Sequence, residues 1–428
     1  KLYKMDVLDG SFDNITGSLT ITSGNHCDFE TFLNEVYITN NTDVPFKWTA
    51  SGNGAAMTVP TDLTAAKFVK QFNNYLFLAN VVVDGTHHAS RIYWSNLLTT
   101  STWSATDYID IAKNDGQEIT GLRVLSDRLV VYKSRSIYNV FYTGDSDIPF
   151  ILPGGGKANS SVGCSSGFSI QDIENGHVFM SYDGFYFYDG SNSTKISDKI
   201  NNTFLGLNTT RLDLARSLVQ RNKNKYWCSL PSASQTENDR VLVWDWINNA
   251  WSIYVGMAPS SMATFYVAGY DERPYFGDYA GYVYRGDIGD DDYPLNVQTA
   301  INAIYYTNWK SFQDLVDKKG IPNVTIYFQN SNSILTFGYS YDFEGDNGGL
   351  ASSDSDQYTQ TIDLSTSTDV YGTGVYGTAI YAGTGGDVTR RDLTGRGRVV
   401  RFKFANNTIG ERFQIDGMGV LGHLETNK

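Results

Sequence analysis

Two adjacent histidines, His87 and His88, are the first residues whose type suggests chemistry. Histidine nitrogens are common zinc ligands, so a pair of them is a candidate for part of a metal site. Adjacent residues of a strand point to opposite faces, however, so the two rings cannot easily share one ion. A metal would need further ligands from distant loops. We therefore predict that the pair binds no metal.

The stretch "DIGDDDY", Asp287 to Tyr293, concentrates four carboxylates and could attract calcium. It lacks the oxygen-ligand spacing and the terminal Glu of an EF-hand loop. Runs of like charge are most often solvated. We interpret the stretch as an exposed acidic linker.

A glycine triplet, Gly154 to Gly156, precedes Lys157 and superficially suggests a phosphate-binding loop. The required spacing from an earlier glycine is missing, and no Ser or Thr follows the lysine. We interpret the triplet as a flexible connection between two structural units.

Residue types that serve catalysis are present, but no recognisable sequence motif surrounds them. The chain has 46 acidic residues, so pairs of carboxylates for glycoside hydrolysis are always available, but none stands in a distinctive pattern. Its 29 Tyr and 8 Trp would suit sugar stacking, although such aromatics are commoner in cores. Cys27, Cys164 and Cys228 are far apart and odd in number, and we interpret them as small buried thiols. We predict no catalytic, cofactor-binding or metal-binding residue, and a protein that is not an enzyme.

One basic cluster lies near the C-terminus. Its members are Arg390, Arg391, Arg396, Arg398, Arg401 and Lys403. Strand alternation places Arg401 and Lys403 on one face, opposite an apolar face that contains Val400 and Phe402. A solvated strand face is the favoured interpretation. The functional alternative is docking onto an acidic neighbour, for example another copy of this protein.

The composition sets limits on the class of protein. The chain has 428 residues, enough for a large core and more than one domain. With 41% hydrophobic and 18% charged residues it is too apolar for disorder, and no apolar run approaches the length that crosses a bilayer. The formal net charge of −13 offers duplex DNA little phosphate-neutralising surface. The chain does not begin with Met, and its first residues lack the apolar core of a signal peptide, so we expect its native start to be missing.

The elements that would carry these residues form a repeat. The stretch "NGHVFMSYDGFYFYDG", Asn175 to Gly190, reads as two strands joined by the Asp183–Gly184 turn, which favours a tight hairpin. Each similar stretch has a polar lead-in, an apolar strand, a turn and an aromatic-rich strand. The other copies begin at Asn34, Asn73, Asp127, Asn224 and Glu272.

Even spacing of these hairpins predicts a β-propeller. Their starts are roughly 40 to 55 residues apart, the period expected of propeller blades. A lone hairpin is barely stable in water, whereas a propeller buries both faces of every blade. That explains consecutive aromatics, as in Phe185 to Tyr188, where a one-sided sheet would alternate. We expect an all-β chain with a propeller of about six blades in residues 1–295. An irregular array of β-sandwiches is the alternative.

Residues 296–428 lack the period and predict a smaller β-sandwich-like domain. Alternating strands flank a polar turn at Asn330 to Ser333, and further strands follow Gly395. The Gly/Ser/Thr-rich stretch from Gly348 to Gly386 predicts long loops with short strands. Residues 311–320 could form a short helix or an extended segment.

Several stretches, taken in order, resemble one family. Residues 91–144, which contain "SRSIYNVF", and residues 162–200, which contain the hairpin from Asn175 to Gly190, resemble successive segments of bacteriophage neck and tail propeller proteins. "VLVWDWINNAWSIY" resembles a later blade of these proteins, and "GRGRVVRFKFAN" resembles their closing β-domain. The resemblance spans about Lys67 to Leu421, but its individual motifs are weak. The family comprises packaged-DNA-stabilisation proteins, tail nozzles and related hub proteins.

The resemblance implies a virion structural protein. We expect a homo-oligomeric ring that extends the portal channel, retains packaged DNA and lets it exit, with the portal or adaptor and other tail proteins as partners. DNA would pass without sequence-specific binding, because an acidic lumen repels phosphates. The family implies location in the phage tail or neck, no cofactor and no membrane partner. The alternatives are an extracellular glycan-binding or glycoside-cleaving propeller and a tail-tip protein that recognises the host.

Overall fold

The computed structural model is an all-β structure with two compact units, residues 1–286 and 287–428. The acidic stretch 287–295, which we had assigned to the propeller, belongs to the second unit. The structure describes residues 1–6, 10–158, 161–267, 271–312, 315–329, 331, 333–346, 354–364 and 387–424.

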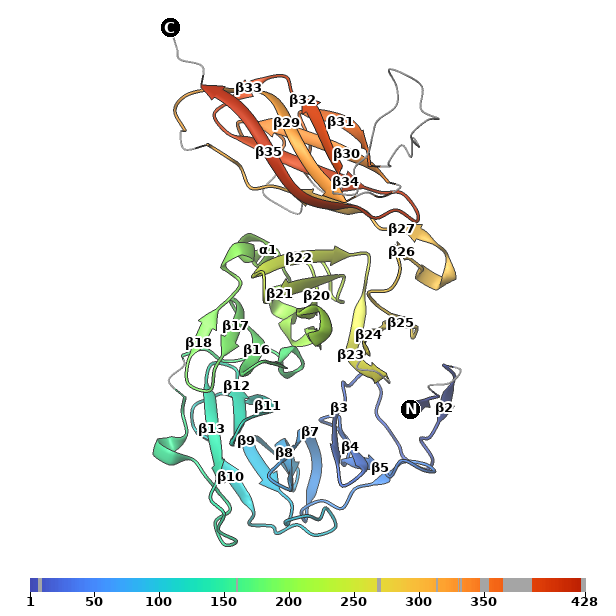
Figure 1. Cartoon of the computed structure of the whole chain (residues 1–428). Helices are drawn as coiled ribbons and strands as arrows, with labels where there is room; N and C mark the ends of the chain where they lie inside the picture. The colour runs from blue at the N-terminus through green and yellow to red at the C-terminus, as the bar shows by residue number, and fades with distance from the viewer. Residues whose placement is uncertain are drawn as a thin grey trace. The chain divides into compact units, whose positions relative to one another are not determined.

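The first unit is a β-propeller whose blades follow one another along the chain. Within the described residues, five blades are four-stranded antiparallel meanders, and the sixth has three strands. In Figure 1 the first strand of a blade lies toward the middle of the unit and the last strand lies at the outside, as β7 and β10 show for blade 2. Each blade is therefore one continuous stretch of sequence.

Blade 1 consists of β3 (Asp28–Phe32), β4 (Glu35–Thr39), β5 (Phe46–Trp48) and β6 (Ala55–Ala56). Blade 2 consists of β7 (Leu63–Phe72), β8 (Tyr75–Val83), β9 (Thr86–Trp94) and β10 (Tyr108–Asp110). Blade 3 consists of β11 (Ile119–Leu125), β12 (Arg128–Lys133), β13 (Ile137–Tyr142) and β14 (Phe150–Ile151). Before blade 1, β1 (Tyr3–Met5) and β2 (Phe12–Asn14) form a separate two-stranded sheet.

Blade 4 consists of β15 (Gln171–Ile173), β16 (Gly176–Ser181), β17 (Gly184–Tyr188) and β18 (Ser193–Lys195). Blade 5 consists of β19 (Arg216–Gln220), β20 (Lys225–Leu230), β21 (Arg240–Asp245) and β22 (Ala250–Val255). Blade 6 consists of β23 (Pro259–Val267), β24 (Asp271–Asp278) and β25 (Val283–Arg285). Short helical turns join them, namely η1 (Pro153–Gly155), η2 (Gly167–Ser169), η3 (Asp198–Ile200), α1 (Asn201–Leu205), η4 (Thr209–Leu214) and η5 (Arg221–Lys223).

The predicted propeller is confirmed, and each of the six predicted hairpins supplies the second and third strands of one blade. The hairpin from Asn175 to Gly190 shows why its aromatics are consecutive. All six residues of β16 are buried, and Phe185, Tyr186 and Tyr188 of β17 are buried too. Both faces of this blade lie against neighbouring blades, so neither face needs polar residues.

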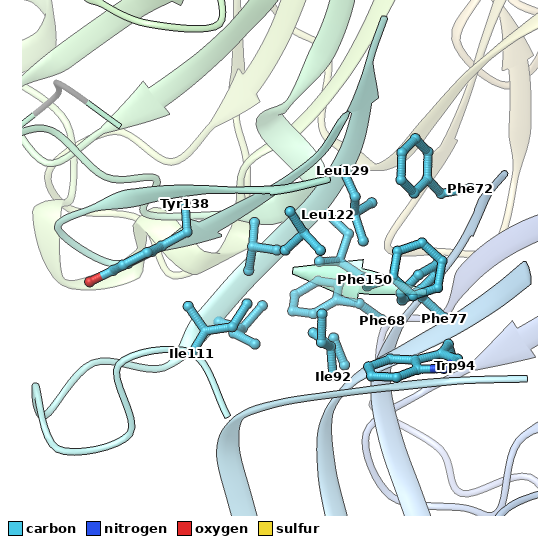
Figure 2. Packing of buried hydrophobic residues seen from close by; sticks show 14 of the residues in the cluster. Phe68, Phe72, Phe77, Ile92, Trp94, Ile111, Leu122, Leu129, Tyr138 and Phe150 are labelled. Atoms are coloured by element: carbon cyan, nitrogen blue, oxygen red, sulfur yellow. The ribbon is translucent and has the colours of Figure 1, made fainter. Parts of the chain in front are cut away.

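Hydrophobic clusters between neighbouring blades stabilise the propeller. One of them joins blades 2 and 3 and is drawn in Figure 2. Phe150 lies at its centre, where its ring contacts Phe77 edge-on at 4.8 Å and Trp94 at 5.3 Å between centroids. Truncating such a buried Phe costs about 3–5 kcal/mol of stability.

The second unit is a β-sandwich of two four-stranded sheets, as expected. One sheet has the order β28–β34–β30–β31. In the other, β29 pairs with β32 and β33 along one edge and with β35 along the other. The elements of the unit are β26 (Asp291–Asp292), η6 (Pro294–Asn296), β27 (Thr299–Ala300), β28 (Ala303–Tyr306), β29 (Lys319–Gln329), β30 (Ile334–Tyr341), β31 (Tyr358–Asp363), β32 (Asp387–Asp392), β33 (Arg396–Gly397), β34 (Val400–Asn406) and β35 (Gln414–Leu424).

Two details of this unit differ from the sequence-based expectations. Within residues 311–320 the described positions contain no helix, and Lys319 and Gly320 begin β29 because the sandwich core buries them. The strands on either side of the turn at Asn330 to Ser333 belong to different sheets, so they do not pair with each other. Most of the Gly/Ser/Thr-rich stretch lies outside the described residues, and β31 is the strand described within it.

Candidate functional site at the propeller axis

An aromatic and charged cluster gathers side chains from blades that are not neighbours. Phe168, in η2 before blade 4, lies 6.3 Å from Phe68 of blade 2 and 6.1 Å from His26, which precedes blade 1 (ring centroids). The guanidinium carbon of Arg216, from blade 5, lies 4.5 Å from the centre of the Phe168 ring. Side chains from blades 1, 2, 4 and 5 can meet only near the axis about which the blades are arranged (Figure 1). We define these four residues as the axial cluster.

The guanidinium of Arg216 is buried in this cluster. Its Nη1 donates to the carbonyl oxygens of Ala215 at 2.7 Å and Asp213 at 3.1 Å. Burial lowers the pKa of Arg216 to about 10, against the opposing influence of Tyr279 and Asp213. The group therefore stays charged at neutral pH, and the Phe168 ring provides a cation–π contact in place of water.

His26, in contrast to Arg216, carries no charge at neutral pH. Desolvation, followed by the positive charge of Arg216, lowers the pKa of His26. The imidazole is therefore neutral at pH 7, and the cluster contains one cation rather than two.

A set of polar contacts joins the inner strands of blades 1 to 4. The Oδ2 atom of Asp28 accepts a hydrogen bond from the backbone N–H of Val69 at 3.0 Å, and the Nζ atom of Lys70 lies 2.5 Å from Glu30. Burial raises the pKa of Asp28, although Arg123 acts in the opposite direction. Arg123 in turn donates from Nε and Nη2 to the carbonyl oxygen of residue 170, which leads into blade 4.

Similar contacts join blades 4, 5 and 6. Arg221 donates to the carbonyl oxygen of Asp172 at 3.0 Å and to the hydroxyl of Tyr266 at 2.8 Å. Glu272 accepts hydrogen bonds from the backbone N–H groups of Arg221 and Asn222. Arg221 of η5 and Glu272 of β24 therefore connect neighbouring blades and hold the propeller together.

The structure separates the two candidate histidines, as strand alternation predicted. In β9, His87 is opposite Val82 and His88 is opposite Val81. The Nε2 atom of His87 lies 2.5 Å from the amide oxygen of Asn80. Among the described residues, no group of three or more His, Cys, Asp or Glu is arranged to hold a metal ion.

The acidic stretch is only partly the exposed linker that we predicted. Asp291 is buried, and its carboxylate accepts from the backbone N–H of Gly410 at 2.7 Å and from Gln298 at 2.6 Å. Desolvation, followed by the charge of Asp291, raises the pKa of Asp292. The stretch thus includes a strand of the second unit, and Asp291 fastens it to the loop before β35.

The glycine triplet forms an ordered turn at the edge of blade 3. Gly154, Gly155 and Gly156 all have positive φ, which explains the choice of glycine. The carbonyl oxygen of Gly156 accepts from the backbone N–H of Asn139 at 2.7 Å, and Lys157 forms a β-bridge with Tyr138. These bonds correct the interpretation as a flexible connection.

The predicted solvated basic face is wrong for Arg401 and Lys403. Arg401 is only 5% exposed, and its Nη1 lies 2.6 Å from Asp354. Lys403 pairs with Asp356 at 2.8 Å. Asp354 and Asp356, which are two residues apart, therefore pair with Arg401 and Lys403, which are two residues apart on β34. The sequence itself contains this matching spacing.

Aromatic rings complete the surroundings of Arg401. Its guanidinium carbon lies 4.3 Å from the ring centre of Tyr306 and 4.7 Å from that of Trp309. Among the other members of the basic cluster, Arg398 donates to the carbonyl oxygen of Val316 at 3.2 Å, whereas Arg390 is exposed. This arrangement neutralises the basic strand within the unit.

The three cysteines are free thiols. Cys164 and Cys228 are buried, and burial raises the pKa of each to about 12. Cys27 is partly exposed, so the prediction of three buried thiols holds for two of them. Thiols with raised pKa values are poor nucleophiles at neutral pH.

Comparisons with known proteins add the following. No protein-family model matches the chain, and no curated protein matches it. Among solved structures, it is similar to BamB from Moraxella catarrhalis, with 11% identity over 60% of this chain and 68% of that one, at a TM-score of 0.36. It is also similar to the N-terminal domain of Nup159, with 13% identity over 60% of this chain and 74% of that one, at a TM-score of 0.34.

A third similar structure is an exo-β-1,3-galactanase from Phanerochaete chrysosporium, with 9% identity over 97% of this chain and 98% of that one, at a TM-score of 0.29. Likeness of this degree carries no argument about function. Within the described part of the chain, the helices are too short or too polar to cross a membrane.

Proposed function

We propose that this chain is a virion structural protein of a phage neck or tail, which forms a ring that extends the portal channel. The supporting observation is the agreement between the order of the family-like segments and the structural units. Residues 162–200 contain blade 4, and residues 241–254 cover all but the first and last residue of the segment from β21 to β22 in blade 5. Residues 395–406 contain β33 and β34 of the sandwich.

In this proposal the propeller is a stiff building block, and DNA passes through the lumen of the ring. The axial cluster and the polar contacts between blades tie the blades to one another. A rigid block of this kind can bear the force of packaged DNA without catalysing a reaction. The DNA path lies between copies of the chain and outside the axis of each propeller.

The charge of the chain fits a passage for DNA. Acidic residues outnumber basic residues in both units, and the basic strand of the sandwich is neutralised by Asp354 and Asp356. Tight DNA binding requires cations that release counterions from phosphates. A wall with few free cations retains DNA by its shape and allows it to slide.

Imaging the purified chain together with the portal protein of the same virus would test the proposal. We expect rings attached coaxially to the portal, and labelled antibodies should mark the neck or tail of intact particles. Strict monomers that never join the portal would contradict it. Tight binding on a glycan array would favour a glycan-binding propeller, and adsorption blocked by free protein would favour host recognition.

A further inference from the structure

The C-terminal strand β35 has an open edge of unusual length. It spans eleven residues, Gln414–Leu424, and among the described residues it pairs only with β29. Natural sheets protect exposed edges with charged side chains, especially lysine, with prolines, with β-bulges or with very short strands. This strand contains neither Lys nor Pro, and Asp416 is its one acidic or basic residue apart from a histidine. A β-bulge at Asp416 interrupts the edge, so its regular part is Gly417–Leu421. Among the described residues, no strand pairs with the outward backbone groups of this part, and they can accept another strand.

The core beside this edge is incompletely covered. Ile415, Met418 and Val420 pack against the buried core of the sandwich but are themselves only partly buried. A strand alongside β35 would cover these side chains and pair its backbone. The edge thus combines unpaired backbone with apolar area, which together favour strand addition.

The opposite edge of the same sheet is formed by β32. Both β32 and β35 are antiparallel to β29, so they run in the same direction. In β32, Val388 is 55% exposed and Arg390 is exposed. The sheet therefore presents an exposed carboxylate, Asp416, at one edge and an exposed guanidinium, Arg390, at the other.

From this complementarity we infer that the edge of β35 pairs with β32 of a second copy of this chain. The contact joins two different edges, so it is heterologous, and repeating it generates a ring when the rotation between successive copies closes. The sheet of one copy then continues into the sheet of the next. This inference rests on the proposed ring and names the interface that forms it.

Charge reversal tests the pairing at two exposed positions. Asp416→Arg and Arg390→Asp should each weaken self-association about tenfold, because each places like charges across the contact. The double variant should restore association. Lys310→Glu, a charge change at an exposed residue outside both edges, should leave it unchanged. Light scattering over a concentration series measures the effect, and circular dichroism shows that the variants are folded.

Cysteine pairs test the direction of the contact. In one copy, residues 416 and 390 lie on opposite sides of β29, residue 390 opposite Thr325 and residue 416 at the register shift between Tyr327 and Phe328. Their Cα atoms are therefore more than two strand spacings, about 9–10 Å, apart. A disulfide needs Cα atoms within about 7 Å. An Asp416→Cys/Arg390→Cys variant should therefore form crosslinked ladders only between copies. Crosslinked dimers of the Asp416→Cys single variant would indicate β35 paired with itself and would overturn the inference.

The outcomes separate this inference from the proposed function. Oligomers that resist both charge reversals would overturn the β35–β32 contact and leave the ring proposal standing. Oligomers that depend on the contact but never join the portal would support the contact and contradict the neck or tail function. A wild-type chain that stays monomeric throughout the concentration series would overturn both.

Discussion

The guanidinium of Arg216 lies over the ring of Phe168, with its central carbon 4.5 Å from the ring centre. The two residues come from different blades, and Phe168 also contacts Phe68 and His26. A single aromatic side chain therefore connects four parts of the propeller that are remote in sequence. The stability of the whole propeller should depend on it more than its partial exposure suggests.

We expect Phe168→Ala to lower the free energy of unfolding by about 2–4 kcal/mol, from the lost packing and the lost cation–π contact. Phe29→Ala is a suitable control, because Phe29 is 56% exposed and its removal should cost little. Urea titrations followed by circular dichroism measure both changes. Equal effects of the two substitutions would contradict a special role for Phe168.

The turn that positions Phe168 gives a second prediction. A Cβ atom on Gly167 would lie 2.1 Å from the carbonyl oxygen of Thr120, which belongs to the backbone of blade 3. Gly167→Ala should therefore displace η2 and destabilise the propeller by more than about 2 kcal/mol. Gly206→Ala meets nothing closer than 3.4 Å and serves as the control. Thermal melts of the two variants should differ clearly, and matching melting temperatures would argue against the close approach.

The paired charges of the sandwich give a third prediction. Asp354→Ala would remove the 2.6 Å ion pair of the buried guanidinium of Arg401 and leave the longer one, 3.7 Å, to Asp346. Removing one partner of a buried ion pair costs about 3–5 kcal/mol, because the remaining charge stays desolvated. Asp127→Ala, at an exposed ion pair, should cost less than about 1 kcal/mol. Denaturation monitored by tryptophan fluorescence would detect the loss, since Trp309 lies against Arg401.

The sequence predicted the blades well because the repeat is local. Each hairpin is encoded by a short stretch such as Asn175 to Gly190, in which strand residues and turn residues alternate at fixed spacing. It could not predict the axial cluster, because Phe68, Phe168 and Arg216 come from three different repeats and are ordinary residues within each. Only the closure of the propeller brings them together.

The error over Arg401 and Lys403 has a similar physical origin. Strand alternation correctly placed them on one face, but exposure depends on what covers that face. The covering residues, Asp354 and Asp356, lie in a polar stretch with no periodic pattern. The two acids have the same two-residue spacing as Arg401 and Lys403, and this match was the available signal. It predicts ion pairs only once β34 is known to face the acids.

Buried His177 makes the stability of the propeller depend on pH. It is 0% exposed, its Nδ1 lies 2.8 Å from the hydroxyl of Tyr132, and its Nε2 lies 3.2 Å from the carbonyl oxygen of Val124. Burial lowers the pKa of His177 to about 4, although Asp172 acts in the opposite direction. The unfolded chain, with an ordinary histidine pKa of about 6.5, therefore binds this proton more readily than the folded chain does.

The stabilising effect of neutral His177 is complete above about pH 6.5 and is lost as the pH falls towards 4. We expect the free energy of unfolding to fall by a few kcal/mol over this window in the wild-type chain. In His177→Gln that fall should be smaller, although the variant is less stable at pH 7 because it loses packing. His87→Gln should keep the full pH dependence and is the matched control. Urea titrations at pH 7 and pH 5 measure the difference, and the same dependence in all three proteins would show that groups other than His177 cause it.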